Sequence, residues 1–261
     1  MEIIDTHAHL DMGAFDKDRA EVISRAVEAG VKTIVSVGID LASSRKAIAL
    51  AEANPGVRAT VGFHPHEAAR LQKADLDAML ELTRHLKVVA IGEIGLDFYR
   101  NLSPREIQFQ ALRWQLVLAE KAGLPVIIHT RQAEADILRE LEDWSAEYQL
   151  PPGQARGVIH CFSESLATAQ HCLAMGFYIA FGGYVGYLSS RRLYDIIKAI
   201  PDDRIVVETD CPFLPPQPYR GQRNEPSYLP ITLSVLAGIR GVTAEKMAEE
   251  TTRNARRLFR L

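Results

Sequence analysis

Ile3-Ile4-Asp5-Thr6-His7-Ala8-His9 is the first segment of the chain with a recognisable pattern. An apolar pair, typical of a buried strand, leads directly into Asp-x-His-x-His. Because side chains on a strand alternate between two faces, we expect Asp5, His7 and His9 to point the same way. Two imidazoles one pleat apart can bind one metal ion. The pattern is short enough to arise by chance, so its meaning depends on the rest of the chain.

The composition is that of one large globular domain. The chain has 261 residues, of which 47% are hydrophobic, and we expect a single domain over residues 1–261. The net charge of −3 argues against a long nucleic acid bound along a basic face. A substrate that carries phosphate would therefore need locally placed cations, which metal ions can supply.

The cysteines and the first residues bear on the cellular compartment. Cys161, Cys172 and Cys211 are odd in number and widely spaced, which favours reduced thiols over a disulfide framework or a cysteine zinc site. We find no signal-peptide pattern and no apolar run long enough to span a bilayer. We therefore expect a cytoplasmic protein without a membrane partner. No heptad pattern or obviously apolar exposed helix indicates a dimer, so we expect a monomer.

Short β-branched runs alternate with helical patterns along the whole chain. The predicted strands are residues 3–9, 33–37, 57–63, 88–91, 125–128, 157–159, 177–181 and 204–207. The predicted helices are residues 16–29, 43–54, 74–86, 103–122, 133–148, 163–175, 189–200, 227–238 and 243–258, and Ser103-Pro104-x-Glu106 predicts a capping box. Alternating strands and helices indicate a parallel sheet, and eight such units match an α/β fold of the (β/α)8 TIM-barrel type. An open doubly wound sheet is the alternative, because periodicity does not reveal closure.

Side chains able to bind metal follow the predicted strands. They are His7 and His9 after the first strand, His64 after the third, Glu93 after the fourth, His129 after the fifth, His160 after the sixth and Asp210 after the eighth. In a parallel barrel these strand ends meet on one face, where active sites lie. Any one of these histidines is readily explained as a hydrogen-bonded core residue. A set gathered at one face favours a metal site instead.

Four imidazoles and two carboxylates are a suitable ligand set for two divalent ions. The candidates are His7, His9, Glu93, His129, His160 and Asp210. Nitrogen and oxygen ligands suit Zn, Mn, Fe or Co better than Ca. Because no cysteine belongs to the set, a closed structural zinc site is not expected. The fourth strand offers Glu93 and no lysine, which makes Glu93 the natural bridging ligand.

Six segments resemble those of the TatD family of metal-dependent deoxyribonucleases, within the amidohydrolase superfamily. They are Asp-Thr-His-Ala-His (5–9), Gly-Phe-His-Pro-His (62–66), Gly-Glu-Ile-Gly-Leu-Asp (92–97), His-Cys-Phe-Ser (160–163), Glu-Thr-Asp-Cys-Pro (208–212) and Pro-Tyr-Arg-Gly-x-Arg-Asn-Glu-Pro (218–226). The resemblance implies a TIM barrel in which one ion is held by His7, His9, Glu93 and Asp210, and the other by Glu93, His129 and His160. One departure is Glu164, where the family usually has glycine, and we expect it to alter the cleft edge without loss of metal binding.

The predicted chemistry is hydrolysis of a phosphodiester by a water that two ions activate. The ions would be Zn, Mn, Mg or Co. Glu93 and Asp210 are the catalytic candidates, and Asp210 either relays a proton or serves only as a ligand. The resemblance implies a 3′-5′ exodeoxyribonuclease. DNA with single-stranded or short ends fits a chain without a basic groove.

Several further residues have two open interpretations. His64 contacts a substrate phosphate or a third ion, as the resemblance suggests, or else closes its own turn. Arg131 pairs with phosphate or is a solvated charge. In the loop after the last strand, Arg220 and Arg223 either bind substrate or are held there by Glu225.

Other residues near these motifs are assigned supporting or packing roles. Phe98 and Tyr99 either stack on a base or pack within the protein, and packing is the commoner role of aromatic side chains. Asp5 and Glu208 are expected to support the ligands from behind.

Two rival functions remain open from the sequence. The first is hydrolysis of a carboxyl ester, lactone or amide by the same metal site, including removal of an amino acid from tRNA. Such substrates need no phosphate clamp, so Arg131 and Arg220 distinguish them from phosphodiesters. The second rival is a metal-binding scaffold without catalytic activity.

Overall fold

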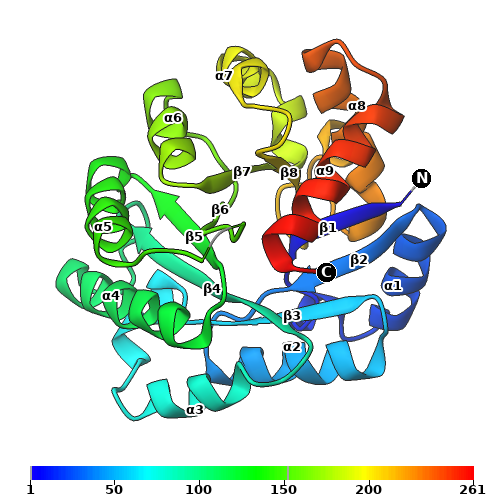
Figure 1. The fold of residues 1–261 in the computed structure, drawn as a ribbon. Helices are drawn as coiled ribbons and strands as arrows, with labels where there is room; N and C mark the ends of the chain where they lie inside the picture. The colour runs from blue at the N-terminus through cyan, green and yellow to red at the C-terminus, as the bar shows by residue number, and fades with distance from the viewer. Residues whose placement is uncertain (1, 152) are drawn as a thin grey trace.

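The computed structural model describes residues 2–151 and 153–261. In these residues eight parallel strands form one sheet in the order β1 to β8 (Figure 1). The strands are β1 (Ile3–Ala8), β2 (Val31–Ser36), β3 (Val57–Val61), β4 (Val88–Asp97), β5 (Val126–Arg131), β6 (Gly157–Ile159), β7 (Phe177–Phe181) and β8 (Ile205–Val207). The residues after β8 return to β1: the Asp210 amide donates to the His7 carbonyl at 2.9 Å and the His9 amide to the Cys211 carbonyl at 2.8 Å. The predicted TIM barrel is confirmed, and the open sheet is excluded.

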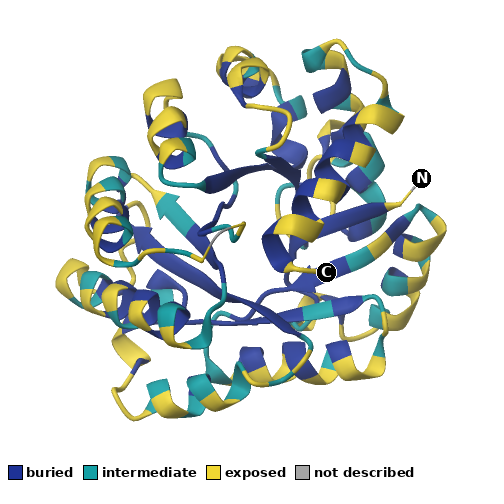
Figure 2. Ribbon diagram, viewed as in Figure 1, coloured by how far each residue is buried: buried dark blue, intermediate teal, exposed yellow. Residues whose placement is uncertain are grey.

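Helices surround the sheet and turn their buried faces toward it (Figure 2). Those in the described part of the chain are α1 (Arg19–Glu28), α2 (Leu41–Ala53), α3 (Asp75–Leu82), α4 (Arg105–Ala122), α5 (Glu134–Glu147), α6 (Leu166–Ala174), α7 (Tyr194–Ala199), α8 (Leu229–Arg240) and α9 (Ala244–Phe259). Among residues 2–151 and 153–261, none of these helices combines the length and apolar character needed to cross a bilayer.

Some predicted element ends are wrong, and each has a local cause. The first helix begins at Arg19 instead of residue 16, because residues 13–15 form a separate 3-10 turn that buries Phe15. The capping box at 103–106 does not form. The Ser103 hydroxyl instead donates to the His66 carbonyl at 2.9 Å and accepts from the Ala69 amide at 3.0 Å, which ties the loop after β3 to the start of α4.

Apolar residues fill the barrel interior and leave one end open. This lumen cluster consists of Ile4, Val35, Val37, Val89, Ala90, Ile127, Val158, Tyr178, Ala180, Val206, Ala255, Leu258 and Phe259. Its last three members belong to the end of α9, which lies across the centre of the barrel in Figure 1. Since α9 closes the end where the strands begin, the polar strand ends gather at the opposite mouth.

Two strands carry one extra residue just before predicted ligands. In β1, Asp5 pairs with Ile34 but Ala8 pairs with Ser36, and in β4, Ile91 pairs with Val126 but Ile94 with Ile128. In each case three steps on one strand match two on its partner, which is the signature of a β-bulge. A shift of one residue turns the following side chains to the other face of the sheet.

The bulge in β1 explains how two of the predicted ligands come to face the barrel mouth. Ile4 lies in the lumen cluster, so regular alternation from it would direct His7 and His9 toward the helices. The extra residue reverses this, and the two side chains enter the mouth instead. Bulges commonly re-aim side chains next to active sites.

Candidate metal centre

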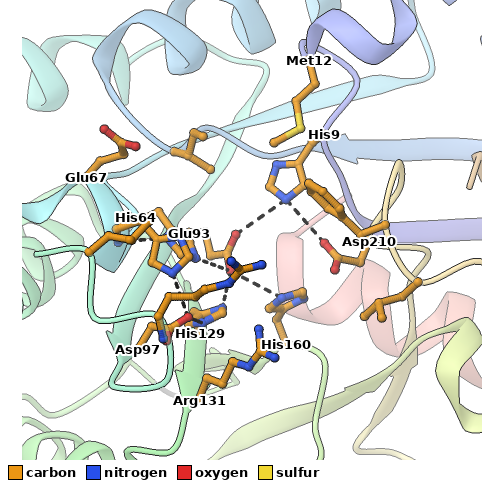
Figure 3. Close-up of a pocket in the computed structure, with 16 residues that line it drawn as sticks. His9, Met12, His64, Glu67, Glu93, Asp97, His129, Arg131, His160 and Asp210 are labelled. Atoms are coloured by element: carbon orange, nitrogen blue, oxygen red, sulfur yellow. Dashed lines mark hydrogen bonds and ion pairs between the residues drawn. The ribbon is translucent and has the colours of Figure 1, made fainter. Parts of the chain in front are cut away.

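Glu93 lies buried at the centre of the barrel mouth, and each of its carboxylate oxygens faces a different group of side chains (Figure 3). Around Oε2 lies the first cluster, formed by His7, His9 and Asp210. His7 Nε2 is 3.4 Å and His9 Nε2 3.7 Å from Oε2. The Asp210 Oδ1 atom lies 3.4 Å from His9 Nε2 and 3.7 Å from His7 Nε2, and the two imidazole nitrogens are 3.2 Å apart.

Around the other oxygen, Oε1, lies the second cluster, formed by His64, His129 and His160. His129 Nδ1 is 2.9 Å from Oε1, His160 Nε2 3.4 Å and His64 Nε2 3.5 Å. The structure therefore brings together all six predicted ligands, and it places His64 beside them. The His64 Nδ1 atom also accepts from the His66 amide at 3.1 Å, so the same ring closes its own turn.

The spacing of the first cluster is that of atoms arranged around one cation. Tetrahedral ligands about 2.0–2.1 Å from a metal lie about 3.3–3.4 Å from one another. The measured separations of 3.2–3.7 Å between the donor atoms bracket this value. Imidazole nitrogen and carboxylate oxygen are also the donors that Zn, Mn and Co accept. The residues present thus fit a divalent ion.

Burial and neighbouring charges shift the pKa values of Glu93 and His160. Burial raises the pKa of Glu93, but the surrounding His64, His160 and His7 outweigh burial and hold it well below its ordinary value. Burial lowers the pKa of His160, yet Glu208 and Glu93 raise it to about 10. The carboxylates therefore keep the His160 imidazole protonated. A divalent cation bound there would displace this proton, since a metal binds the neutral ring.

Carboxylates behind the two clusters contact a ring nitrogen or the backbone of the histidines. Glu208 Oε1 lies 3.1 Å from His160 Nδ1 and accepts the Cys161 amide at 2.6 Å. Asp5 accepts from the amides of His7 and Thr209, and burial raises its pKa to about 7. Both residues occupy the supporting places expected of them, because each contacts a ligand or its backbone without entering either cluster.

Asp97 is a supporting residue that the sequence analysis did not identify. Its Oδ2 atom lies 3.2 Å from His129 Nε2 and 2.8 Å from His66 Nε2, and its Oδ1 atom accepts the Arg100 amide at 2.7 Å. His129 is thus held between Glu93 and Asp97, an arrangement common behind metal-binding histidines. The available signal was its position four residues after Glu93 in the same segment.

Gly95, between these two carboxylates, has a φ of +149°. A Cβ atom there would lie 1.9 Å from the His129 carbonyl oxygen. Glycine therefore permits β4 to pass close against β5 at the site.

Comparison with known proteins agrees with this geometry. The family model described as TatD related DNase matches residues 4–260. The chain belongs to the TatD family. It is 42% identical to the metal-dependent hydrolase YabD of Bacillus subtilis over 259 residues, covering 99% of both chains. It is 39% identical to the 3′-5′ ssDNA/RNA exonuclease TatD of Pantoea vagans, covering 99% of this chain and 100% of the relative. The predicted membership of this family of metal-dependent hydrolases is confirmed.

Solved structures give the same result for the fold. The TatD homologue YJJV of Escherichia coli K12 superposes with a TM-score of 0.91 at 31% identity, covering 99% of this chain and 98% of that one. A TatD family hydrolase from Entamoeba histolytica superposes with a TM-score of 0.87 at 25% identity. The TIM barrel of this chain is therefore that of the TatD family.

The TatD-type site opens into a cavity of about 450 Å³. Arg100 and Arg131 line it, and the Arg131 guanidinium lies 4.0 Å from the centre of the Tyr99 ring. Figure 3 shows Arg131 beside His160. The cavity thus joins both clusters to two cations, which gives an acidic protein a local site for an anion.

The structure does not bring every candidate to this TatD-type cavity. Arg220 is exposed and lies over Tyr187, 4.7 Å from the ring centre, and it is not among the lining residues. Arg223 pairs with Asp18 at 2.6 Å, and Glu225 pairs with Arg25 at 2.6 Å. These contacts anchor the loop after β8 to α1.

Glu164 is half-buried and does not line the cavity either. Burial, with Glu134 adding to it, raises the Glu164 pKa. This carboxylate therefore lies apart from the residues that surround Glu93.

Proposed function

We propose that this protein hydrolyses phosphodiester bonds at the 3′ end of single-stranded nucleic acid with two divalent ions. The observation that carries the proposal is the buried Glu93 carboxylate, whose two oxygens face separate groups of donor atoms. In this proposal His7, His9, Glu93 and Asp210 hold one ion, and Glu93, His129 and His160 hold the other. The names of curated relatives, among them the Pantoea vagans 3′-5′ ssDNA/RNA exonuclease, support the substrate class.

The protein's own residues bind the substrate and move the proton. Two bound ions would lower the pKa of a water molecule and offset charge on the phosphate. Asp210 is the carboxylate of the first cluster that also lines the cavity, so it is placed to take the proton of the attacking water. Burial raises the pKa of Asp210, but His9 and the other imidazoles outweigh burial and lower it, which keeps the carboxylate ionised and able to accept.

Arginines in the cavity provide the phosphate contact. Arg131 and Arg100 present planar guanidinium groups, which pair with phosphate oxygens through charge-assisted hydrogen bonds. The Arg131 guanidinium packs over the Tyr99 ring. Because the whole chain carries a net charge of −3, attraction for nucleic acid arises at this local site and not along an extended basic surface. Short or single-stranded ends suit such a site.

The test is metal-supplemented hydrolysis. The protein is stripped with a chelator, supplied with Mg, Mn, Co or Zn singly, and mixed with a 3′-labelled single-stranded oligonucleotide. We expect release of labelled nucleotide that depends on an added ion and is abolished in Glu93→Gln. The matched control is His85→Ala, because His85 contacts Glu52 on the far side of the fold from the clusters and should leave the rate unchanged.

The outcomes separate the function from the metal site. Release that Glu93→Gln leaves intact would refute a reaction at this centre. Binding of about two ions without release from any oligonucleotide would retain the metal site and replace the phosphodiester by a carboxyl ester or lactone. The cytoplasmic location and the monomeric state remain predictions, to be checked by fractionation and by light scattering.

A further inference from the structure

Two large apolar side chains stay exposed at the mouth of the metal cavity. Phe213 is 49% exposed and Leu102 66% exposed, and both line the cavity. Phe213 follows β8 and Leu102 follows β4, strands that lie across from each other in a closed barrel of eight. Apolar surface left at the rim of a polar cavity commonly marks a place where a ligand binds.

Hydrogen bonds hold the backbone around Phe213 and so fix the position from which its ring projects. The Phe213 amide donates to the Asp210 carbonyl at 2.9 Å. The Asn224 side-chain amide donates to the carbonyls of Phe213 and Thr209 at 2.7 and 2.8 Å, and Asn224 is itself fully buried. The ring centre lies 6.1 Å from that of His9, with an angle of 72° between the planes. Phe213 is therefore fixed directly beside the first cluster.

The two aromatic side chains that follow β4 already contact arginines. Phe98 is buried, and the Arg105 guanidinium lies over it, 4.2 Å from the centre of the Phe98 ring. Tyr99 lies against Arg131. Of the two aromatic residues considered from the sequence, Phe98 thus packs within the protein and Tyr99 supports an arginine. Among the described residues that line the cavity, Phe213 is the one with a benzene ring.

We propose that Phe213 stacks on the base of the nucleotide whose phosphate enters the two clusters, and that Leu102 bounds the opposite edge of the same subsite. This proposal rests on the proposed nuclease function and specifies its substrate. An aromatic ring offers a surface to any base, so the subsite is tolerant of sequence. A base held in a duplex is stacked on its neighbours and paired, so the subsite selects ends whose last base is unpaired.

The test pairs one variant with two oligonucleotides. The single strands are identical except that one ends in an ordinary nucleotide and the other in an abasic nucleotide at the same position. We expect Phe213→Ala to reduce kcat/KM on the ordinary strand by about 5- to 150-fold, mainly through KM, the loss expected for one stacked base. On the abasic strand the change should be under about 2-fold. Phe213→Tyr should restore the preference, because tyrosine also stacks.

A matched control and a binding assay keep the outcomes separate. Leu188→Ala removes an apolar side chain that is 76% exposed outside the cavity, and it should change neither substrate. Fluorescence anisotropy then measures the affinity of chelator-stripped protein for both strands. If the wild type binds the ordinary strand more tightly and Phe213→Ala abolishes this preference, the subsite is supported. That conclusion holds even if no ion yields hydrolysis, because the absence of hydrolysis would reject only the nuclease function. Equal affinity for the two strands, or equal losses of kcat/KM on both, overturns the subsite while metal-dependent hydrolysis still stands.

Discussion

Replacing Asp97 by asparagine tests whether His129 belongs to a metal site. Asp97 is fully buried, and its Oδ2 atom faces two imidazole nitrogens at 2.8 and 3.2 Å. Asparagine has nearly the same shape but carries no charge and offers only one acceptor oxygen. If its amide nitrogen takes the place of Oδ2, the Nε2–H groups of His129 and His66 both lose their acceptor; if its oxygen does, both keep only an uncharged acceptor and the Arg100 amide loses its partner. In either case the ring of His129 is held less firmly against Glu93.

The expected loss follows from the role of such outer carboxylates. Removing one typically weakens metal binding by about 10- to 100-fold, or about 1.4 to 2.7 kcal/mol. We expect titration calorimetry of chelator-stripped protein with Zn or Mn to resolve two binding events in the wild type. In Asp97→Asn the event at the second cluster should weaken by this factor, and the event at the first cluster should stay within about twofold.

The control is another carboxylate of the same cavity. The Glu67 side chain lines the cavity but pairs with Arg70 at 2.8 Å, and Glu67 contacts a cluster residue through its backbone amide, which donates to the His64 carbonyl at 2.8 Å. Glu67→Gln should therefore leave both binding events unchanged, and thermal melts should show that both variants remain folded. Unaltered affinity in Asp97→Asn, or equal weakening of both events, would refute the link from Asp97 through His129 to a metal.

Further variants test substrate contact, helix capping and core packing. Arg131→Ala should raise KM for an oligonucleotide by about 10- to 100-fold, the loss of a charge-assisted hydrogen bond, and leave KM for an uncharged carboxyl ester unchanged; equal effects would contradict phosphate binding. Asp40 accepts the Ser43 amide at 2.7 Å at the start of α2, so Asp40→Ala should lower the free energy of unfolding by about 1 kcal/mol in urea melts. Burial raises the pKa of Asp40, but hydrogen bonds from Ser43 outweigh it and lower the pKa. The stabilisation by the Asp40 charge is therefore present above its ordinary pKa of 3.8 and is lost as pH falls through the lower folded value. Asp40→Asn still caps the helix but carries no charge. The difference in free energy of unfolding between the wild type and Asp40→Asn should therefore shrink as pH falls from 7 to 3. Phe15→Ala removes a fully buried ring and should cost about 3–5 kcal/mol in the same melts, whereas a cost below about 1 kcal/mol would show that the site collapses.

The barrel and the gathering of the candidate ligands were predictable because they depend on local patterns. Short β-branched runs mark the strands, and parallel strands place their ends together whatever the loops contain. His129 and His160 follow this rule directly, since each continues the regular alternation of its strand. The family motifs then supplied the proposed division of these candidates between two ions, which spacing alone left open.

The features that were missed depend on contacts between distant segments. The bulges in β1 and β4 are visible only as pairings with β2 and β5, so sequence alternation cannot reveal them. Asp97 acquires its role from His66, in the 3-10 turn after β3, and from His129 on β5. Arg220 and Arg131 are both candidate phosphate contacts from the sequence, but Arg131 ends β5 and lines the cavity, whereas Arg220 lies in the loop after β8 and contacts Tyr187 instead.

The bulge in β1 also determines what would be required to transplant this candidate centre. A designer who copied the predicted ligands onto a barrel with regular strands would aim His7 and His9 into the layer of surrounding helices. The result would be a folded scaffold with two imidazoles buried among the helices and an incomplete site at the mouth. The inserted residue of β1 must therefore be copied together with the two histidines, because the number of residues between Ile4 and the histidines sets the face of the sheet on which they lie.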